Sequence, residues 1–447
     1  MTAVMLSKAR SDHALSTALD EAKEKYIARN PRSLALYQAA QSSMPGGNTR
    51  SALFYDPFPL YVAESFDAQI RDADGHLYLD GLGEFTAGLY GHSDAAIREA
   101  IMEAARRGVS NGAPGETEIR LAEAICERFP AIESVRFCNS GTEANLYALT
   151  LARAFTGRKK LIAFSGAYHG GVFVFSRGGA QVNAPYDWTV CRYNEIKETI
   201  ATISRLGSEL AAVIVEPMMS NGGCIPATRE FLQALRSACD EVGALLVFDE
   251  VVTSRMGRAG SHDLVQVNPD LVTLGKYIGA GFSFGAFGGR ADILGLMDPR
   301  RPDALPHAGT FNNNVFTMSA GLVGLTEVFT SERAEALHET GEALRERLND
   351  LAARSCPLVQ FTGMGSVMNI HFAAGEILSP EDLAGEPRDL INLFHFDLME
   401  EGVYIARRGQ INLSLAMSGK DLDALEAAVA VFLERRRPLI CAIADDR

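Results

Sequence analysis

A lysine and an aspartate stand at the ends of two apolar runs, where together they could hold a pyridine cofactor. Lys276 follows the run Leu271–Leu274, and Asp249 ends the run Ala244–Asp249. A carboxylate can pair with a protonated pyridine nitrogen, and a lysine amine can form an imine with the aldehyde of pyridoxal phosphate. Taken alone, each residue is explained as well by an ordinary solvated charge, because most Asp and Lys side chains are exposed. Other segments of the chain must distinguish these interpretations.

A segment with two hydroxyl side chains is typical of an anion site. The sequence NSGTEA at 139–144 follows an apolar run and opens a helical stretch, so that Ser140 or Thr142 can cap the first turn. Free N–H groups, the positive end of the helix dipole and hydroxyls all favour an anion there. An ordinary capped helix explains the segment as well. If the strand before this segment and the strand that ends at Asp249 belong to one open sheet, however, the segment becomes a phosphate site, because ligands of such sheets bind at the carboxyl ends of the strands.

Three more segments carry side chains that suit a cofactor site. Tyr168, in AYHGG at 167–171, could stack on a flat ring, although a turn with a half-buried tyrosine is the simpler interpretation. Glu216 and Asn221 flank a short loop and could orient polar edges of a cofactor, whereas the glycines after Asn221 suit turn geometry. Thr310, in HAGTFNNN at 307–314, could contact a phosphate or cap the next helix.

Arginines on two loops are candidates for carboxylate binding. Arg50 lies in a loop rich in Gly, Pro and Asn, and Arg408 follows Arg407 in the sequence IARRG. A guanidinium binds a carboxylate through two parallel hydrogen bonds. Most arginines in proteins are exposed to solvent, so the sequence also allows each of these two to be a surface residue without a ligand.

Composition narrows the class of protein. The chain has 447 residues, 47% hydrophobic and 22% charged, with a net charge of −14, and its length predicts more than one domain. The negative charge argues against nucleic acid or an anionic membrane as partner, but not against a small anionic substrate. The seven cysteines are odd in number and form no CxxC pair, so we expect reduced thiols. Without a signal-peptide core or a membrane-length apolar run, the expected location is the cytoplasm.

Helical stretches alternate with short apolar runs between about 94 and 300. The predicted helices are Ala95–Arg107, Glu116–Arg128, Thr142–Phe155 and Arg229–Val242, and the predicted strands are Val135–Cys138, Lys160–Phe164, Ala211–Glu216, Ala244–Asp249, Leu271–Leu274 and Phe282–Gly289. This alternation predicts an α/β fold with a mostly parallel sheet covered by helices. Residues 12–43 read as two helices and Leu60–Asp80 as short strands. After 310, helices at 316–330, 332–353, 389–401 and 420–436 and strands at 358–372 and 403–415 indicate a smaller α+β region.

Several enzyme classes lack their motifs in this chain. There is no HExxH and no GxxxxGK[ST], and no GxGxxG lies at a strand–helix turn, which argues against a nicotinamide dehydrogenase. One GxSxG match, at 108–112, follows a helical stretch, whereas a hydrolase nucleophile follows a strand. A binding protein without a cofactor remains a possible interpretation of the residues alone.

Taken together, the motifs resemble the class III aminotransferases of pyridoxal-phosphate fold type I. The resemblance covers about residues 35–435 and rests on NSGTEA (139–144), AYHGG (167–171), VEP (215–217), FDEV (248–251), TLGKYIGAG (273–281) and HAGTFNNN (307–314). The branch it resembles contains glutamate-1-semialdehyde aminomutases and β-amino acid aminotransferases. MPGGNTRS (44–51), LFYDPFPL (53–60), TSRMG (253–257), SFGAFGGRAD (283–292) and ARRGQINLSL (406–415) are more similar to the β-phenylalanine aminotransferases.

The resemblance implies a role for each candidate residue. Lys276 would bind the cofactor aldehyde and Asp249 its ring nitrogen. The phosphate would be held by Ser140, Gly141 and Thr142, and the ring would lie between Tyr168 and Val251. Thr310 would reach the phosphate of a neighbouring subunit in a homodimer, Arg50 would bind the carboxylate of a β-amino acid, and Arg408 would be the mobile arginine for the dicarboxylate acceptor. Supporting roles are expected for His169, Glu216 and Asn221, although the loop Met218–Asn221 departs from related transaminases.

The resemblance also implies a fold and a reaction. The fold would have a large domain with a seven-stranded, mostly parallel sheet at 66–315, a small α+β domain at 316–447, and an N-terminal segment at 1–65 that joins the small domain. The expected reaction is a ping-pong transfer of the amino group of a β-amino acid, aromatic or aliphatic, to 2-oxoglutarate or pyruvate. The alternative is glutamate-1-semialdehyde 2,1-aminomutase. No metal is expected.

Overall fold

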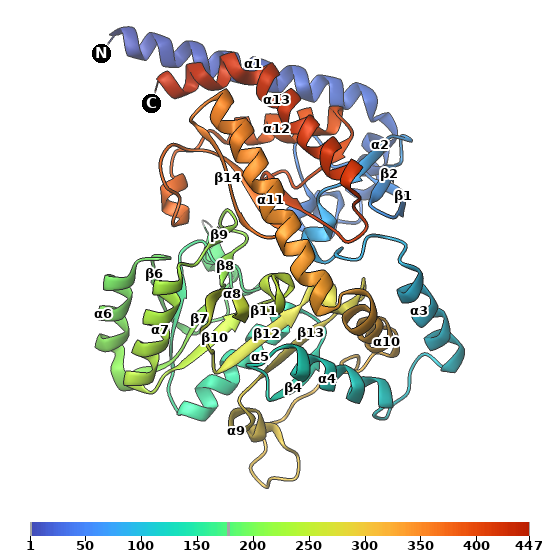
Figure 1. Ribbon diagram of the computed structural model, residues 1–447, viewed down its shortest axis with the longest axis vertical. Coiled ribbons are helices and arrows are strands. Elements are labelled where there is room, and N and C mark those ends of the chain that lie inside the picture. Colours follow the sequence, from blue (N-terminus) through green and yellow to red (C-terminus); the bar gives the residue numbers. More distant parts are fainter. Residues whose placement is uncertain (1, 177–178, 447) are drawn as a thin grey trace.

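A seven-stranded sheet lies at one end of the molecule and the helices of both chain termini lie at the other (Figure 1). The computed structural model describes residues 2–176 and 179–446. The strand order is β4-β13-β12-β10-β7-β5-β6. The strands are β4 (Ser134–Cys138), β5 (Lys160–Phe164), β6 (Asp187–Cys191), β7 (Leu210–Val215), β10 (Leu245–Asp249), β12 (Leu271–Gly275) and β13 (Gly285–Gly289). Only β13 runs antiparallel to its neighbours in this sheet, which confirms the predicted mostly parallel arrangement.

Helices cover both faces of this sheet and bury it. Strands β7, β10 and β12 are buried at every residue, as their unbroken apolar sequences predict. On one face, α5 (Gly141–Thr156) packs Ala148 into a core with Leu161 and Val247. On the other, α7 (Arg229–Val242) packs Phe231 into a core with Phe248. The remaining helices of this part are α3 (Ala95–Arg107), α4 (Glu116–Arg128), α6 (Ile196–Leu206), α8 (His262–Val265), α9 (Ala291–Leu294) and α10 (Val315–Val323).

Strands from both ends of the sequence share a four-stranded sheet. Its order is β1 (Val62–Phe66), β2 (Gln69–Asp72), β3 (Leu77–Asp80) and β16 (Val403–Tyr404), with β3 parallel to β16. A three-stranded sheet contains β14 (Val359–Met364), β15 (Val367–Phe372) and β17 (Gln410–Asn412). The helices around these sheets are α1 (Thr2–Arg29), α2 (Pro31–Ala40), α11 (Ser331–Ser355), α12 (Arg388–Glu400) and α13 (Gly419–Asp445). The domain boundaries at 65 and 315 stay a prediction.

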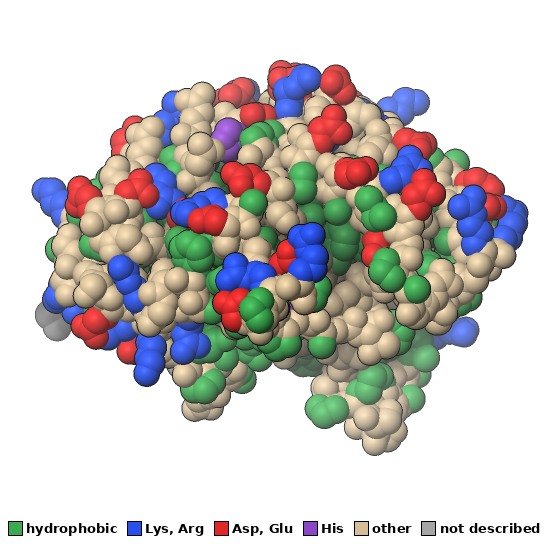
Figure 2. All heavy atoms as spheres, turned by 90° about the horizontal axis from the view of Figure 1, so that it is seen from below, with side chains coloured by type: hydrophobic (Ala, Val, Ile, Leu, Met, Phe, Trp, Pro, Cys, Tyr) green, Lys and Arg blue, Asp and Glu red, His purple; other side chains and the backbone are tan. Residues whose placement is uncertain are grey.

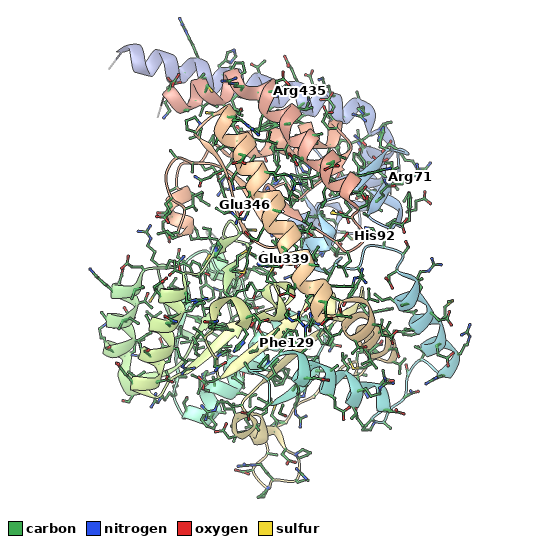
Figure 3. The ribbon with its side chains drawn as sticks, in the orientation of Figure 1. Arg71, His92, Phe129, Glu339, Glu346 and Arg435 are labelled. Atoms are coloured by element: carbon green, nitrogen blue, oxygen red, sulfur yellow. The ribbon has the colours of Figure 1, made fainter. Side chains whose placement is uncertain are left out.

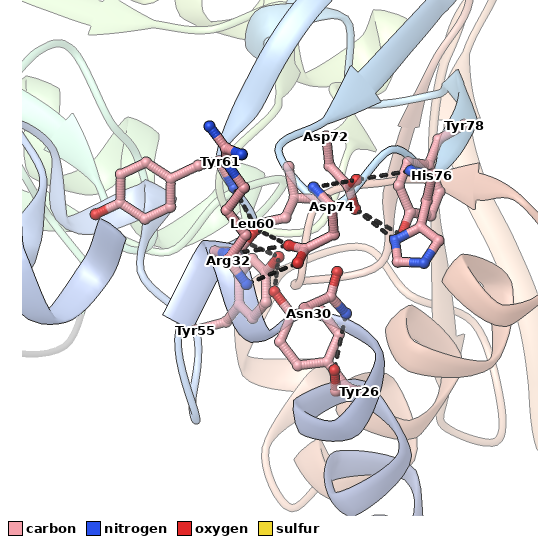
Figure 4. Close-up of polar contacts among 11 residues, drawn as sticks. Tyr26, Asn30, Arg32, Tyr55, Leu60, Tyr61, Asp72, Asp74, His76 and Tyr78 are labelled. Carbon is pink, nitrogen blue, oxygen red and sulfur yellow. Dashed lines mark hydrogen bonds and ion pairs between the residues drawn. The ribbon is translucent and has the colours of Figure 1, made fainter. Parts of the chain in front are cut away.

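Carboxylates in a turn fix the N-terminal helices to the four-stranded sheet. Asp74 lies between β2 and β3 and accepts hydrogen bonds from the backbone N–H groups of Arg32 (2.7 Å) and Ser33 (2.9 Å) in the first turn of α2 (Figure 4). Free N–H groups of a first helical turn are a natural site for a carboxylate. Asp72 accepts from His76 in the same cluster. The cluster holds α2, and with it the following loop that carries Arg50, against the sheet.

Helix α11 connects the two ends of the molecule. In Figure 3, Glu339 and Glu346 mark its course from the neighbourhood of Phe129, below, toward Arg435 on α13, above. Its core-facing side chains include Leu344 and Leu348, both fully buried. One long amphipathic helix therefore packs against elements of both parts.

Some elements differ from those that the sequence indicates. The edge strand β6 and helix α6 were not predicted. Helix α13 runs to Asp445, past the predicted end at Arg436, with Pro438 inside it. The predicted strand Phe282–Gly289 begins only at Gly285. A small hairpin of β8 (Met218–Met219) and β9 (Ile225–Pro226) carries Asn221 in its loop.

The surface shows no concentration of one charge on the face drawn in Figure 2. Basic and acidic side chains alternate there, and hydrophobic side chains lie in the hollow between two projections. Across the described part of the chain, no helix combines the length and apolar character that crossing a membrane requires.

Candidate active site

The carboxyl ends of the parallel strands bring the predicted residues together. Asp249 ends β10 and pairs in register with Thr273 of β12. Lys276 begins the short 3-10 helix that follows β12, with a left-handed φ of +51°. Gly285 of β13 pairs with Gly275 on one side and with Cys138, the last residue of β4, on the other. The loop after β4 therefore lies at the same sheet edge as Asp249 and Lys276.

Four hydrogen bonds surround the buried carboxylate of Asp249. Asn145 Nδ2 (2.8 Å) and His169 Nδ1 (2.7 Å) lie at Oδ2, while the Val251 N–H (3.1 Å) and the more distant Thr273 hydroxyl (3.5 Å) lie at Oδ1. Burial alone raises the pKa of Asp249, but the hydrogen bond and charge of His169 and the Val251 N–H outweigh burial, so the pKa is lowered. The carboxylate is therefore ionised at neutral pH and suits a cationic ring nitrogen.

Burial makes Lys276 a weaker base than a surface lysine. Burial is the largest influence and lowers its pKa, while Asp249 and Glu216 oppose that effect and Arg408 adds to it. The net pKa is lowered. A lysine with a lowered pKa has a larger neutral fraction, and the neutral amine is the form that attacks a carbonyl or takes a proton.

The N-terminus of α5 forms an anion site at the same edge. Ser140 caps the helix by accepting the Glu143 N–H at 3.1 Å. The Thr142 hydroxyl accepts the Gly171 N–H at 3.2 Å, which joins the loop after β5 to the helix. A Cβ on Gly141 would lie 2.9 Å from the Val251 side chain, so no larger residue fits there. The N–H groups of Gly141 and Thr142, which precede the capped Glu143 N–H and have no acceptor within the helix, suit a phosphate.

The loops after β5 and β7 meet beside Asp249. Glu216 is buried and accepts the backbone N–H groups of Tyr168 (3.1 Å) and Ser220 (3.2 Å). Burial raises the pKa of Glu216 to about 7, against the opposing influence of His169. The Tyr168 side chain is 42% exposed, as expected for a ring that is free to cover a ligand. His169 is buried, and its Nε2 has no partner among the described residues.

A cavity of about 790 Å³ opens in front of Lys276. Its walls include Arg50, Ser140, Gly141 and Phe284. Arg50 Nη1 forms an ion pair with Glu84 Oε1 at 2.8 Å, with both side chains about half exposed. The cavity thus brings the lysine, the anion site and one of the two predicted arginines together.

Arg408 reaches the site from the strand region after β16. Its Nη1 donates to Asn221 Oδ1 at 2.7 Å and its Nε donates to Gln410 Oε1 at 3.0 Å, with a further short bond from Nη2 to the same oxygen. The guanidinium carbon lies 5.4 Å from the centre of the Phe85 ring. The guanidinium carbon of Arg50 lies 5.9 Å from the centre of the same ring, so both guanidiniums lie against one aromatic side chain.

A left-handed turn places Phe85 there. Glu84, Phe85 and Thr86 have φ values of +47°, +52° and +81°, which is unfavourable for residues with a Cβ. The surrounding structure fixes the turn: just before it, Asp80 accepts the backbone N–H groups of Leu82 and Gly83, and at its end Arg255 donates to the Thr86 carbonyl at 3.1 Å. Strain of this kind is typical of functional sites.

Thr310 does not line the cavity in front of Lys276. It is exposed and lines a separate hollow of about 400 Å³ with Val109 and Phe311.

Sequence reasoning did not find four of the residues that build the site. Asn145 and Thr273 fix Asp249, and Asn145 Oδ1 accepts the Thr273 hydroxyl at 2.7 Å. Phe85 supports the arginines and Gln410 binds Arg408. Asn145 carried an available signal, because it is a polar residue on the otherwise apolar buried side of its helix. The left-handed turn carried none, since Glu, Phe and Thr do not mark positive φ.

Comparison with known proteins gives a consistent answer. The class III aminotransferase family model matches residues 51–418. The chain is 51% identical over 420 residues to beta-phenylalanine transaminase of Variovorax paradoxus, covering 94% of this chain and 96% of that protein. It is 36% identical to glutamate-1-semialdehyde 2,1-aminomutase of Methanopyrus kandleri, covering 91% and 98%.

Solved structures agree with these matches. The crystal structure of the beta-phenylalanine aminotransferase from Variovorax paradoxus superposes with a TM-score of 0.93 at 50% identity, covering 94% of this chain and 98% of the other. An omega-transaminase from Sphaerobacter thermophilus superposes with a TM-score of 0.86 at 34% identity, covering 91% and 99%.

Proposed function

The chain belongs to the class III aminotransferases, and from this premise we propose that it moves the amino group of a β-amino acid to 2-oxoglutarate or pyruvate. The observation that carries the substrate class is the pair of guanidiniums on the Phe85 ring beside Lys276. Two such groups suit a carboxylic donor and a carboxylic acceptor that bind in turn. The similarity to beta-phenylalanine transaminase supports a donor with an aromatic side chain, and the proposal extends to aliphatic β-amino acids.

Class III aminotransferases depend on pyridoxal phosphate, and the residues of this site fit it. The fit rests on the ionised Asp249, on the N-terminus of α5, and on Gly141, where a Cβ would strike Val251. When bound, the cofactor supplies a pyridine ring that accepts the electron pair left as the substrate loses a proton. Asp249 would hold the proton on the ring nitrogen, because a nearby carboxylate favours the cationic form. Asn145, His169 and Thr273 orient that carboxylate.

The remaining cofactor contacts follow from the placement of the side chains. Ser140, Gly141 and Thr142 would hold the phosphate, and Tyr168 and Val251 would lie on the two faces of the ring. Glu216 would hold the loop that carries Tyr168, because its carboxylate accepts the backbone N–H of Tyr168. Asn221 would act on the substrate side, through Arg408.

Lys276 would carry out the proton transfers. Its Nζ would take the proton from the substrate carbon that bears the amino group and deliver it to the cofactor, as base and then acid. The lowered pKa favours the neutral amine that the first step needs. Arg50 would bind the donor carboxylate after Glu84 moves away, and Arg408 would bind the acceptor.

A homodimer would complete the site. Thr310, which lines a hollow separate from the cavity in front of Lys276, would reach the phosphate of the neighbouring subunit. Phe311 (63% exposed) and Val109 (57% exposed) line the same hollow and would be covered by that subunit. Light scattering after gel filtration should give twice the chain mass of 48.2 kDa.

The cytoplasm is the proposed location. All seven cysteines, each within the described residues, are free, and five of them are buried, as in proteins of reducing compartments. Titration of thiols in the protein unfolded without reductant should find all seven reactive.

A panel of donors with both acceptors tests the proposed function. β-Phenylalanine, β-aminobutyrate, β-glutamate and glutamate-1-semialdehyde would each be assayed with 2-oxoglutarate, with pyruvate and without acceptor. We expect turnover of a β-amino acid that requires an acceptor and follows parallel double-reciprocal lines. The similarity to glutamate-1-semialdehyde 2,1-aminomutase makes that activity the second candidate. Turnover of the semialdehyde without acceptor, and of nothing else, would favour it.

A further inference from the structure

A segment between β15 and α12 leaves the three-stranded sheet and packs on the seven-stranded one. We call this segment, residues 377–386, the strap. Its first residue, Ile377, is buried in the same core as Phe248 of β10. At its other end Glu386 accepts the backbone N–H of Phe372, the last residue of β15, at 2.8 Å. The strap therefore joins the C-terminal part of the chain to the core of the large sheet.

Arg192, directly after β6, fastens the strap to the large sheet. Its Nε donates to the Ser379 hydroxyl at 3.0 Å, and its Nη2 donates to Asp382 Oδ1 at 2.6 Å. Asp382 also accepts the Ser379 N–H at 2.8 Å, which closes the first turn of the strap. Asn194 adds a hydrogen bond to the Leu378 carbonyl at 2.8 Å. One arginine thus holds both ends of this turn at the edge of the sheet.

Pro380, in the turn that Arg192 holds, lies against two glycines. A Cβ on Gly166 would overlap Pro380 Cγ, and a Cβ on Gly222 would lie 3.0 Å from the same atom. Gly166 lies two residues before Tyr168, and Gly222 lies in the loop between β8 and β9. Pro380 itself does not line the cavity of about 790 Å³. It therefore contacts the loop that carries Tyr168 from outside that cavity.

The backbone of its loop determines where the Tyr168 ring lies. The ring is 42% exposed, and its hydroxyl has no hydrogen-bond partner among the described residues. The backbone is held by Glu216, which accepts the Tyr168 N–H at 3.1 Å, and by a β-bridge to Val174. The contact of Pro380 with Gly166 limits movement of the same loop on its N-terminal side, because the closely packed atoms leave no space for a shift.

Building on the proposed role of Tyr168 at the cofactor ring, we infer that Arg192 and Pro380 are positioning residues that act through the strap. They keep the loop of Tyr168 in place, so that its ring covers the pyridoxal phosphate ring and slows the release of the cofactor. Neither residue lines the cavity in front of Lys276. Retention of the cofactor on the large sheet thus depends on a segment from the C-terminal part of the chain.

The test compares two ion pairs of nearly equal exposure. Arg192 and Asp382 are 2.6 Å apart, with side chains 45% and 26% exposed. Arg347 of α11 and Glu426 of α13 are 2.7 Å apart, with side chains 45% and 27% exposed. Arg192→Ala releases the strap, whereas the control Arg347→Ala removes a pair that joins two helices. Each holoenzyme is mixed with excess deuterium-labelled pyridoxal phosphate, and mass spectrometry follows the exchange of the bound cofactor.

We expect the cofactor to exchange about threefold faster or more in Arg192→Ala, as for the loss of one partly exposed ion pair and one hydrogen bond. Arg347→Ala should stay within about 1.5-fold of the wild type, as for a surface substitution. Arg192→Lys, which can still pair with Asp382, should lie between the wild type and Arg192→Ala. An exchange rate in Arg192→Ala equal to that of the wild type overturns the inference, and so does an equal acceleration in Arg347→Ala.

A double-mutant cycle tests whether the strap acts through the Tyr168 ring. Tyr168→Ala removes the ring, so adding Arg192→Ala should then change the exchange rate by less than about 1.5-fold. A full acceleration in this background overturns the inference. An exchange rate of Tyr168→Ala equal to that of the wild type contradicts the role of Tyr168 and the inference together. Exchange needs no amino donor, so a donor panel without turnover would contradict the proposed function and leave this test intact.

A second variant covers the case in which Arg192→Ala does not fold. Pro380→Ala removes the Cγ atom that lies over Gly166 and Gly222 and keeps the ion pair of Arg192 with Asp382. We expect exchange to be about threefold faster or more, as for the loss of buried methylene groups. Unchanged exchange in this variant overturns the inference as well.

Discussion

The ion pair between Arg50 and Glu84 should compete with the substrate. The pair is 2.8 Å long, and its side chains are 46% and 54% exposed. A donor carboxylate that binds Arg50 must displace Glu84. An ion pair with this exposure contributes about 0.2–1 kcal/mol, because water screens it. Removing the competing carboxylate in Glu84→Gln should therefore tighten monocarboxylate binding by about 1.4- to 5-fold.

The assay measures the inhibition constant of 3-phenylpropionate, which has the carboxylate and ring of the proposed donor but no amine. We expect this constant and the KM for β-phenylalanine to fall together in Glu84→Gln, with little change in kcat, since the lost interaction belongs to the free enzyme. The advantage should shrink at high salt, where the pair in the wild type is already weak.

A matched control is available in a second exposed pair. Arg71 and Glu64 lie 2.6 Å apart with exposures of 39% and 57% and are not part of the cavity in front of Lys276. Glu64→Gln should leave both constants unchanged. Weaker binding of 3-phenylpropionate to Glu84→Gln, or the same effect from Glu64→Gln, would refute the reasoning.

Three further outcomes follow from the structure. Lys276→Ala should lose turnover and the absorbance of the lysine-bound cofactor, whereas a variant with full activity would contradict the assignment of Lys276. Ser140→Ala removes the cap of α5 and should cost about 1 kcal/mol of stability, together with cofactor affinity, which thermal unfolding with and without cofactor would measure; an unchanged cofactor affinity would count against the anion site. Burial raises the pKa of Glu250 from 4.5 to about 7, so the folded protein holds a proton between those values that the unfolded chain releases, and the free energy of unfolding should fall as pH rises through this window. The fall should be smaller in Glu250→Gln, and an equal slope in both proteins, measured with urea at pH 5, 6, 7 and 8, would show that Glu250 does not titrate in this range.

Local signals explain the elements that could be predicted. Helices Ala95–Arg107 and Arg229–Val242 have the predicted bounds because Asp94 and Thr228 cap their first turns. Strands such as β5 are short apolar runs with no helical period. The predicted fold, family and cofactor are confirmed. Lys276 and Asp249 lie together because the ends of parallel strands share one edge, which follows from sequence order alone.

Elements that depend on distant partners could not be predicted. Strand β6 is an edge strand with a half-exposed pattern, and within the described residues it pairs with β5 alone. Helix α13 continues through Pro438 although a proline usually ends a helix; Ile440 and Ile443, beyond it, are buried in the core. The contacts of Arg408 with Asn221 and Phe85 join residues far apart in the chain, for which local patterns contain no information. The roles proposed for individual site residues stay predictions.

Arg255 links assembly of the site to completion of the whole chain. This fully buried guanidinium donates to the Ser366 hydroxyl, the Thr86 carbonyl and the Leu413 carbonyl. Its three partners lie 111, 169 and 158 residues away in sequence. The turn that supports Arg50 and Arg408 is therefore held in place by residues from distant parts of the chain, among them Leu413, which directly follows the last strand. Recognition of the acid thus depends on the complete fold and not on the seven-stranded sheet alone.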